Sequence, residues 1–465
     1  MPVGAEPTKQ EEKMKKFLVV LLSLGLIAAF SMPASAADVK VSGSYNLQGG
    51  YDSNPELRDT DKYSKTAFYN AIRIMPVFQV AEGLTFTMRF DAQEKVWGDS
   101  AWRGQTAGTN DDVMSSRPQT AAGGTPKIQE NIEIEYGFVS FNTAVGKFDV
   151  GYMNADGWGT AFFNQSNPRP RIQLTKVFGP LSVLGVYEKR YENVTSAAYA
   201  ANHATDADYD TYALAAIYKW KAGQAGLMYK YWLNNQGRLA ANPFSSRIHQ
   251  VAPYAIAKFG PVDVEAEVMY FFGKTRDLEA PAAGVVNQDA DTLNAGIKAT
   301  YNLGPAYFGA QYAYASGNNP NDATKNKQLN GLGIGYDPTL IIGGGLRQDI
   351  GYDNYLGGVN GTTAIQKTKQ NLVFYNAFGG YNVTPKLNVA GSVTYAHVAS
   401  KPNGYQSSNV GIEVDLGVTY KIYDNLSYLV QGGYLFAGDY WKGANNANAK
   451  YGDEYVVINK LTLNF

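Results

Sequence analysis

The 465-residue sequence predicts an all-β protein: a single transmembrane, antiparallel, up-and-down β-barrel of about 18–20 strands, preceded by a cleavable signal peptide. Three observations predict this fold. The chain begins with a charged and then apolar segment, continues with segments of alternating polarity separated by short turn signals, and ends on an alternating segment whose last residue is aromatic. Alternation with a period of two is the pattern of a strand that faces two different environments.

Residues 1–36 are predicted to be an N-terminal extension and signal peptide. A pair of lysines precedes the apolar run 17–30, and Ala34-Ser35-Ala36 supplies the small residues of a cleavage site. We expect cleavage after Ala36, which leaves 37–465 as one transmembrane β-barrel with long extracellular loops. A methionine stands directly before the lysines, so we interpret residues 1–13 as an upstream extension of the reading frame. The apolar run is shorter than the roughly 20 residues of a membrane-spanning helix, which disfavours a membrane anchor.

Composition excludes several classes of function. The chain has no cysteine, which excludes disulfides, thiolate metal sites and a cysteine nucleophile. Its 40 basic and 41 acidic side chains nearly balance, so charge gives no argument for binding nucleic acid. Tyrosine and glycine are frequent and the mean hydropathy is slightly negative, as expected for a barrel in which only alternate residues of each strand are apolar.

Short turn signals separate the predicted strands. They lie at 82–83, 142–143, 179–180, 222–223, 260–261, 304–305, 337–338, 384–385 and 424–425. The flanking alternating segments are long enough, at about 3.3 Å per residue, to cross a bilayer as tilted strands. Hairpins at these turns, together with a first and a last strand, give about twenty strands, with eighteen as the alternative. The longer polar segments between hairpins are expected to be extracellular loops.

The last eleven residues, YVVINKLTLNF, are predicted to form the strand that closes the barrel. Lys460 and Thr462 are expected on its lumenal side, and it should pair with the first strand near Val39–Tyr51. The opposite side is expected to face lipid and consists of Tyr455, Val457, Leu461, Leu463 and Phe465.

A terminal strand of this form resembles the closing strand of Gram-negative outer-membrane β-barrel proteins. With the signal peptide and the strand pattern, the whole mature chain resembles a porin, without matching a particular subfamily. The resemblance implies a water-filled channel in the cell outer membrane for passive diffusion of small hydrophilic solutes and ions, without a cofactor. It also implies assembly by periplasmic chaperones and the barrel-assembly machinery, contact with membrane lipid and lipopolysaccharide, and a homotrimer.

Charged side chains occupy the positions that alternate with the lipid-facing ones, and we expect them to line the lumen. The candidate pore-lining residues are Arg73, Arg89, Asp91, Glu133, Glu135, Lys147, Asp149, Arg171, Arg190, Arg347 and Asp349. The same alternation places Glu188, Lys230, Glu265, Glu267, Glu413 and Asp415 inside. Arginines among carboxylates could set up a transverse field, and the mixture of signs predicts weak ion selectivity.

A barrel of this size is too wide to be filled by the side chains of its wall, so we expect an inward-folded loop. No plug domain is expected before the first strand. Length favours segment 96–127, whereas porin-like order favours 154–169, the third outer loop. The glycines around Asp337-Pro338 (Gly331, Gly333, Gly335, Gly343 and Gly345) are placed on two strands, either as a bare wall against which a loop packs or as a relief of strand curvature.

The sequence also bears on an enzyme, a metal site, a substrate-specific channel and a scaffold as alternative functions. His203, His249 and His397 lack the partners of a lipase or protease site, and the acidic run Asp206, Asp208, Asp210 is interpreted as a charged loop, so neither an enzyme nor a metal site is predicted. A substrate-specific channel for a sugar, aromatic acid or oxyanion is the nearest alternative. Aromatic side chains at Tyr69, Trp232, Tyr254 and Phe271 would favour sugar or aromatic substrates if they face the lumen. The remaining alternative is a barrel scaffold for an electron-transfer or surface partner.

Overall fold

The computed structural model describes residues 38–97, 132–192, 207–343 and 369–465, apart from residues 56, 61, 63, 166, 281, 282, 334, 445–447 and 449. Several predictions concern positions outside the described residues. These are the signal peptide with Ala34 and Ala36, the candidate lining residues Arg347 and Asp349, Gly345, and most of the loop 96–127.

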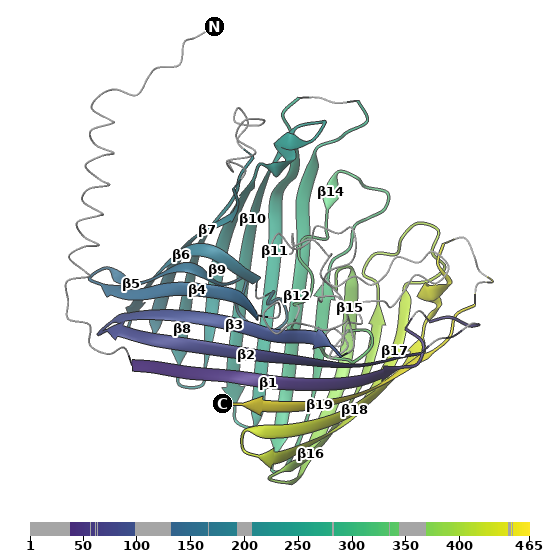
Figure 1. The fold of residues 1–465 in the computed structure, drawn as a ribbon. Coiled ribbons are helices and arrows are strands. Elements are labelled where there is room, and N and C mark those ends of the chain that lie inside the picture. Colours follow the sequence, from purple (N-terminus) through teal and green to yellow (C-terminus); the bar gives the residue numbers. More distant parts are fainter. Residues whose placement is uncertain are drawn as a thin grey trace, which may run out of the picture.

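Within the described residues, nineteen strands belong to one sheet. The two-residue strand β14 (Lys325–Asn326) pairs in parallel with β12 and stands apart from the ring. The other eighteen pair antiparallel with their neighbours along the chain, and β1 pairs with β19, so they close into a barrel (Figure 1). Their bounds are β1 Asp38–Asp52, β2 Lys65–Ala81, β3 Leu84–Val96, β4 Ile132–Thr143, β5 Gly146–Ala155, β6 Asn167–Phe178, β7 Leu181–Tyr191, β8 Tyr209–Trp220, β9 Gly223–Asn234, β10 Phe244–Phe259, β11 Val262–Leu278, β12 Gln288–Leu303, β13 Ala306–Ala315, β15 Leu372–Thr384, β16 Leu387–His397, β17 Asn409–Tyr423, β18 Leu426–Ala437 and β19 Glu454–Asn464.

Two short 3₁₀ turns, η3 (Gln236–Leu239) and η6 (Asp439–Lys442), accompany the strands in the described part of the chain. No helix among the described residues is long and apolar enough to cross a membrane.

The predicted closing strand is confirmed. β19 pairs with β1 in a register that runs from Ser44 opposite Asn464 to Asp52 opposite Val456. At the chain end, the Gly43 N–H donates to the Phe465 carbonyl at 2.7 Å and the Phe465 N–H donates to the Gly43 carbonyl at 3.0 Å. Figure 1 shows β1 between β2 and β19, with the C-terminus at this seam. The chain's two ends therefore join one continuous sheet.

Each strand separates two environments, as the alternation predicts. On β11, the side chains of Val268, Tyr270 and Phe272 are exposed on the outer face, whereas the alternating residues Glu267, Met269 and Phe271 are buried on the inner face. On β19, Tyr455, Val457 and Phe465 are likewise exposed. The outer face is an apolar band, which fits contact with lipid.

The inner face of β19 carries a feature that the sequence analysis did not predict. Val456 and Ile458 are almost completely buried there, with 1% and 0% of their surfaces exposed. They belong to a hydrophobic cluster with residues of segments that lie inside the barrel, among them Phe162 and Leu332. The lumen therefore contains its own apolar core.

Eight of the predicted turns lie at the ends of consecutive strands, but the prediction of a hairpin at Asp337-Pro338 is wrong. β13 pairs directly with β15, from Ala306 opposite Tyr381 to Ala315 opposite Leu372. The chain between them leaves the barrel wall, and its described residues are 316–343, apart from 334, and 369–371. The stretch 316–343 is called the long insertion below. Removing one hairpin from the predicted twenty strands leaves the eighteen observed. Glycine and apolar residues alternate in this segment because it packs inside the lumen, where Leu332 and Ile341 are buried.

The seam between β1 and β19 leaves no room for a side chain at Gly43. A Cβ atom there would lie 2.3 Å from the Arg73 carbonyl oxygen and 2.7 Å from Cζ of the Phe465 ring. We expect Gly43→Ala to lower the free energy of unfolding in lipid vesicles by about 1–3 kcal/mol, because the added methyl overpacks the seam. The control is Gly185→Ala on β7, where a Cβ would have no heavy atom within 4 Å. Equal urea unfolding midpoints for the two variants would contradict this account of the seam.

Candidate functional site

Two segments occupy the lumen. One is the loop between β5 and β6, residues 156–166, called the third loop, and the other is the long insertion. They meet inside the barrel: the Gly333 N–H donates to the Phe162 carbonyl at 2.6 Å, and the rings of Phe162 and Tyr336 lie 4.8 Å apart. The third loop is the segment that porin-like order favoured, whereas the long insertion was not expected as a loop.

Gly333 shows why the glycines of the long insertion are needed. A Cβ atom there would lie 2.5 Å from the Ala161 carbonyl oxygen and 2.7 Å from the Asn164 carbonyl oxygen. The backbone of the insertion thus lies directly on the backbone of the third loop. Of the two alternatives predicted for these glycines, close packing against a loop fits Gly333 and relief of strand curvature does not, but the prediction that they lie on wall strands is wrong.

A buried carboxylate of the wall holds the third loop. Glu267 on β11 is 1% exposed, and its Oε2 accepts hydrogen bonds from both the backbone N–H and the hydroxyl of Thr160, each at 2.7 Å. The indole Nε1 of Trp158 donates to the Ala252 carbonyl on β10 at 2.9 Å. The two hydrogen bonds from Thr160 to one buried carboxyl oxygen, together with the Trp158 bond, fix the loop against β10 and β11.

A second wall carboxylate holds the long insertion in the same way. Glu413 on β17 is 0% exposed and accepts the backbone N–H groups of Ile341 at 2.6 Å and Ile342 at 2.7 Å. The turn is closed by the Gly343 N–H, which donates to the Thr339 hydroxyl at 2.6 Å. Successive backbone N–H groups directed at one carboxylate form an anion-binding turn, here filled by the protein's own side chain.

Lys369, three residues before β15, also binds the long insertion. Its buried Nζ donates to the Tyr336 carbonyl and to Oδ1 of Asp337, each at 2.5 Å. Burial lowers the pKa of Lys369, and the neighbouring Asp337 carboxylate partly offsets this effect. The insertion is thus fixed at both Tyr336 and Ile341.

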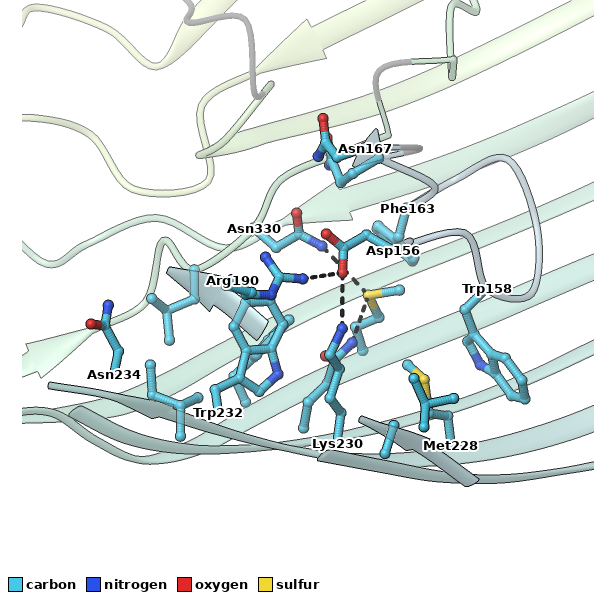
Figure 2. A pocket seen from close by; sticks show the side chains of 18 of the residues that line it. Asp156, Trp158, Phe163, Asn167, Arg190, Met228, Lys230, Trp232, Asn234 and Asn330 are labelled. Atoms are coloured by element: carbon cyan, nitrogen blue, oxygen red, sulfur yellow. Dashed lines mark hydrogen bonds and ion pairs between the residues drawn. The ribbon is translucent and has the colours of Figure 1, made fainter. Parts of the chain in front are cut away.

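Five charged side chains form an ionic cluster where the third loop leaves β5. Figure 2 labels three of them, Asp156, Arg190 and Lys230. Nζ of Lys230 lies 2.8 Å from Glu188 and 2.9 Å from Asp156. Arg190 contacts both carboxylates, and Arg171 lies 3.6 Å from Glu188. The pKa of Asp156 would be raised by burial, but the charges of Lys230 and Arg190 outweigh burial and hold it below the ordinary carboxyl range. Asp156 therefore stays ionised and ties the loop to β7 and β9.

Trp232 supports the two inner cations of this cluster. The guanidinium of Arg190 lies 4.5 Å and Nζ of Lys230 lies 4.9 Å from the centre of a Trp232 ring. The Thr211 hydroxyl donates to Glu188 at 2.6 Å. Both carboxylates and both inner cations thus have partners inside the protein.

The other predicted lining residues lie on the wall of β2 to β5. Nε and Nη2 of Arg73 donate to Asp91 at 3.0 and 2.9 Å, and Arg89 also donates to Asp91, so two arginines enclose one buried carboxylate. Glu133 stands opposite Asp91 in the strand register. On β5, Lys147 lies 2.8 Å from Asp149, which also accepts a hydrogen bond from Ser140.

A β-bulge changes the alternation on β4. Arg89 stands opposite Tyr136 and Phe90 opposite Ile134, so Glu135 is the extra residue. Beyond it, Tyr136 and Ser140 share the inner side with Arg89, whose guanidinium lies 5.8 Å from the Tyr136 ring centre. Unbroken alternation would have placed Tyr136 outside. A single extra residue leaves no clear signal in the sequence.

A cavity of about 820 Å³ lies between the third loop and the wall formed by β6 to β12. Arg171, Arg190 and Lys230 line it, so the structure brings two predicted lining residues together with a third cation. Trp232, Tyr254 and Phe271, three of the four aromatic residues whose direction was left open, also line it, whereas Tyr69 is buried against Ala67 and Ala71 on β2 and is not part of the lining. The sequence analysis missed the amide side chains of the lining, such as Asn154, because isolated Asn and Gln residues carry no pattern that separates lining from loop.

The described residues offer little for a metal ion. Among them, no group of three or more His, Asp or Glu side chains is arranged to hold one. His249 and His397 pack instead against aromatic rings, with centroid distances of 5.0 Å to Phe272 and 5.8 Å to Tyr395.

Comparison with solved structures finds Pseudomonas proteins. The crystal structure of OccK8 (OprE) from Pseudomonas aeruginosa has a TM-score of 0.49 and 12% sequence identity, covering 92% of this chain and 98% of that chain. A BenF-like porin from Pseudomonas fluorescens has a TM-score of 0.49 and 12% identity, covering 92% and 99%. The outer membrane protein OprD from Pseudomonas aeruginosa has a TM-score of 0.47 and 12% identity, covering 91% and 94%.

With identities this low and TM-scores at this level, these similarities carry no argument about solute or mechanism. No protein-family model matches the chain, and no curated protein matches it.

The role of Glu267 can be tested by hydrogen–deuterium exchange. We expect Glu267→Gln to speed exchange in peptides spanning 157–165 by about tenfold, because the amide of Gln accepts the Thr160 hydrogen bonds less strongly than a carboxylate. The control is Glu265→Gln on the same face of β11, whose carboxylate lies 3.2 Å from Lys298. If both variants exchange at the wild-type rate in these peptides, Glu267 does not hold the loop.

Proposed function

We propose that this chain is a porin of the Gram-negative outer membrane, a water-filled channel through which small hydrophilic solutes and ions diffuse passively. One observation carries the proposal: eighteen antiparallel strands close completely, and the segments inside leave a cavity of about 820 Å³ along β6 to β12. The apolar outer face supports a lipid environment, and the polar inner face supports an aqueous lumen. The long insertion packs against inner residues of β13 to β19, and the cavity lies along β6 to β12.

The electrostatics of the lining support weak ion selectivity. Each of Arg73, Arg89, Arg171 and Arg190 has a carboxylate partner within the wall or the third loop. Charges that are paired over a few ångströms produce little field across the lumen beyond about one Debye length, roughly 8 Å at physiological ionic strength. The path therefore presents neither a purely cationic nor a purely anionic surface to a passing ion.

Conductance of the purified protein in a planar lipid bilayer tests the proposal. We expect discrete current steps and a reversal potential close to zero across a KCl gradient. A protein that inserts, verified by protease protection, yet passes no current would overturn the channel function. Absence of current, together with a redox or surface protein that copurifies with the chain, would favour the scaffold alternative. The homotrimer stays a prediction, which the mass of the detergent-solubilised protein would check.

The contact between the two lumenal segments gives a sharper test. We expect Gly333→Ala to raise the single-channel conductance and its noise, because a methyl group there forces the long insertion away from the third loop. Loss of one buried hydrogen bond, about 1 kcal/mol, shifts the segments toward separated arrangements by about fivefold. The control is Gly335→Ala, two residues away, where a Cβ would have no heavy atom within 4 Å. Identical current traces from both variants would show that the contact does not limit the path.

A further inference from the structure

Amide side chains are numerous in the polar lining of the cavity. Asn154, Asn167, Asn234 and Asn330 are four of its nine Asn and Gln lining residues. Within the described part of the chain, the side chains of Asn154 and Asn167 make no hydrogen bond, and Asn330 donates only to the Met269 sulfur at 3.7 Å. Asn234 accepts the Gln236 N–H at 2.9 Å, which leaves its NH₂ group available. An amide both donates and accepts, so this surface matches hydroxyl groups.

The apolar surface of the cavity includes aromatic rings. Trp158 of the third loop and Trp232 of β9 are both partly exposed, and in the view of Figure 2 they lie on opposite sides of Lys230. Tyr209 extends the surface beside Trp232 at a centroid distance of 6.3 Å. The negative face of an aromatic ring favours the weakly positive C–H groups of a solute. Rings beside amides suit a molecule with hydroxyl groups at its edge and C–H groups on its face.

The ionic cluster is largely closed to a solute. The side chains of Lys230, Arg190 and Glu188 are only 6%, 7% and 1% exposed, and their charges are directed at one another and at Asp156. Arg276 is the further cation of the lining, and it lies over the Phe244 ring at 5.6 Å. A charged solute at the ionic cluster would have to compete with existing ion pairs, whereas a neutral solute would not.

We propose, on the basis of the channel function above, that this cavity is a binding site for neutral polyhydroxylated solutes, namely sugars of one or two rings. The apolar face of the sugar lies on Trp158 or Trp232, and its hydroxyl groups bond to Asn154, Asn234 and the neighbouring amides. A cavity of about 820 Å³ falls within the usual range for small-molecule sites, roughly 300–1,000 Å³.

Block of ion current in a planar bilayer tests this assignment. Maltose, a neutral disaccharide, is added to the wild-type channel, and benzoate at the same concentration represents an aromatic anion. We expect maltose to reduce the current saturably and benzoate to reduce it less. In parallel, quenching of tryptophan fluorescence by maltose is titrated in detergent micelles, which reports binding without requiring conduction.

Variants then locate the site. We expect Trp232→Ala to weaken the maltose affinity about fivefold, and Trp232→Phe to restore most of it because a ring face is kept. Asn234→Ala should weaken maltose affinity without a comparable change for benzoate. The matched control is Trp220→Ala on the outer face of β8, which removes an indole that does not line the cavity and should leave the maltose affinity unchanged.

The outcomes separate the site from the channel. Current that maltose does not block, together with unchanged fluorescence, overturns the sugar site and leaves the channel intact. Saturable block by benzoate alone also overturns it and assigns the cavity to organic anions. The wild-type protein could pass no current while maltose still changes its tryptophan fluorescence, and this change could be lost in Trp232→Ala. That result overturns the channel and supports the sugar site.

Discussion

Closure of the sheet is the constraint on which the rest of this structure depends. A strand in hydrocarbon must pair its backbone N–H and C=O groups, because an unpaired group costs several kcal/mol there. The pairing of β1 with β19 satisfies this requirement and removes the last free edges of the sheet. With eighteen strands, however, the side chains of the wall cannot reach across the lumen. Closure of the sheet thus pairs the backbone groups that lie in lipid, but it also encloses a space that other parts of the chain must fill.

Segments that enter the lumen bring backbone groups with them, and these groups need partners too. Glu267 and Glu413 meet this need on two separate walls, each with one carboxylate that accepts donors from the inserted backbone. Asp156 reverses the arrangement, because here the loop supplies the carboxylate and the wall supplies Lys230 and Arg190. Burying a carboxylate is costly unless it is hydrogen-bonded, and each of these groups accepts from two or more donors. The inserted segments are therefore held from three directions, and the remaining space lies beside β6 to β12.

The sequence predicts those features that depend on two-fold alternation and on turns. The closing strand, its pairing with the first strand and eight hairpins follow from residues that must face lipid on one side and water on the other. The same rule fails for residues around Asp337-Pro338, where glycine and apolar residues also alternate. On β17 the inner positions carry polar side chains such as Glu413 and Asp415, whereas Gly331, Gly333 and Gly335 occupy three successive positions of that parity before Asp337. Its apolar residues are buried against the lumenal core instead of facing lipid, and alternation alone does not distinguish these two apolar environments.

The features of the site that the sequence does not predict depend on distances between remote residues. Arg171, Arg190 and Lys230 are recognisable as inward cations, but only the fold shows that Asp156 and Glu188 neutralise them. This pairing changes what the cavity can bind. An anion that displaced Asp156 from Lys230 would leave a buried carboxylate without its partner, and breaking such a pair costs about 3–5 kcal/mol. A hydroxyl group that bonds to Asn154 or Asn167 breaks no existing contact among the described residues, and it replaces water in a site where the ring faces of Trp158 and Trp232 also lose water. Which solute the cavity binds therefore depends on the cost of breaking the ion pairs against the gain from bonding to free amides, and not on the number of cations in the lining.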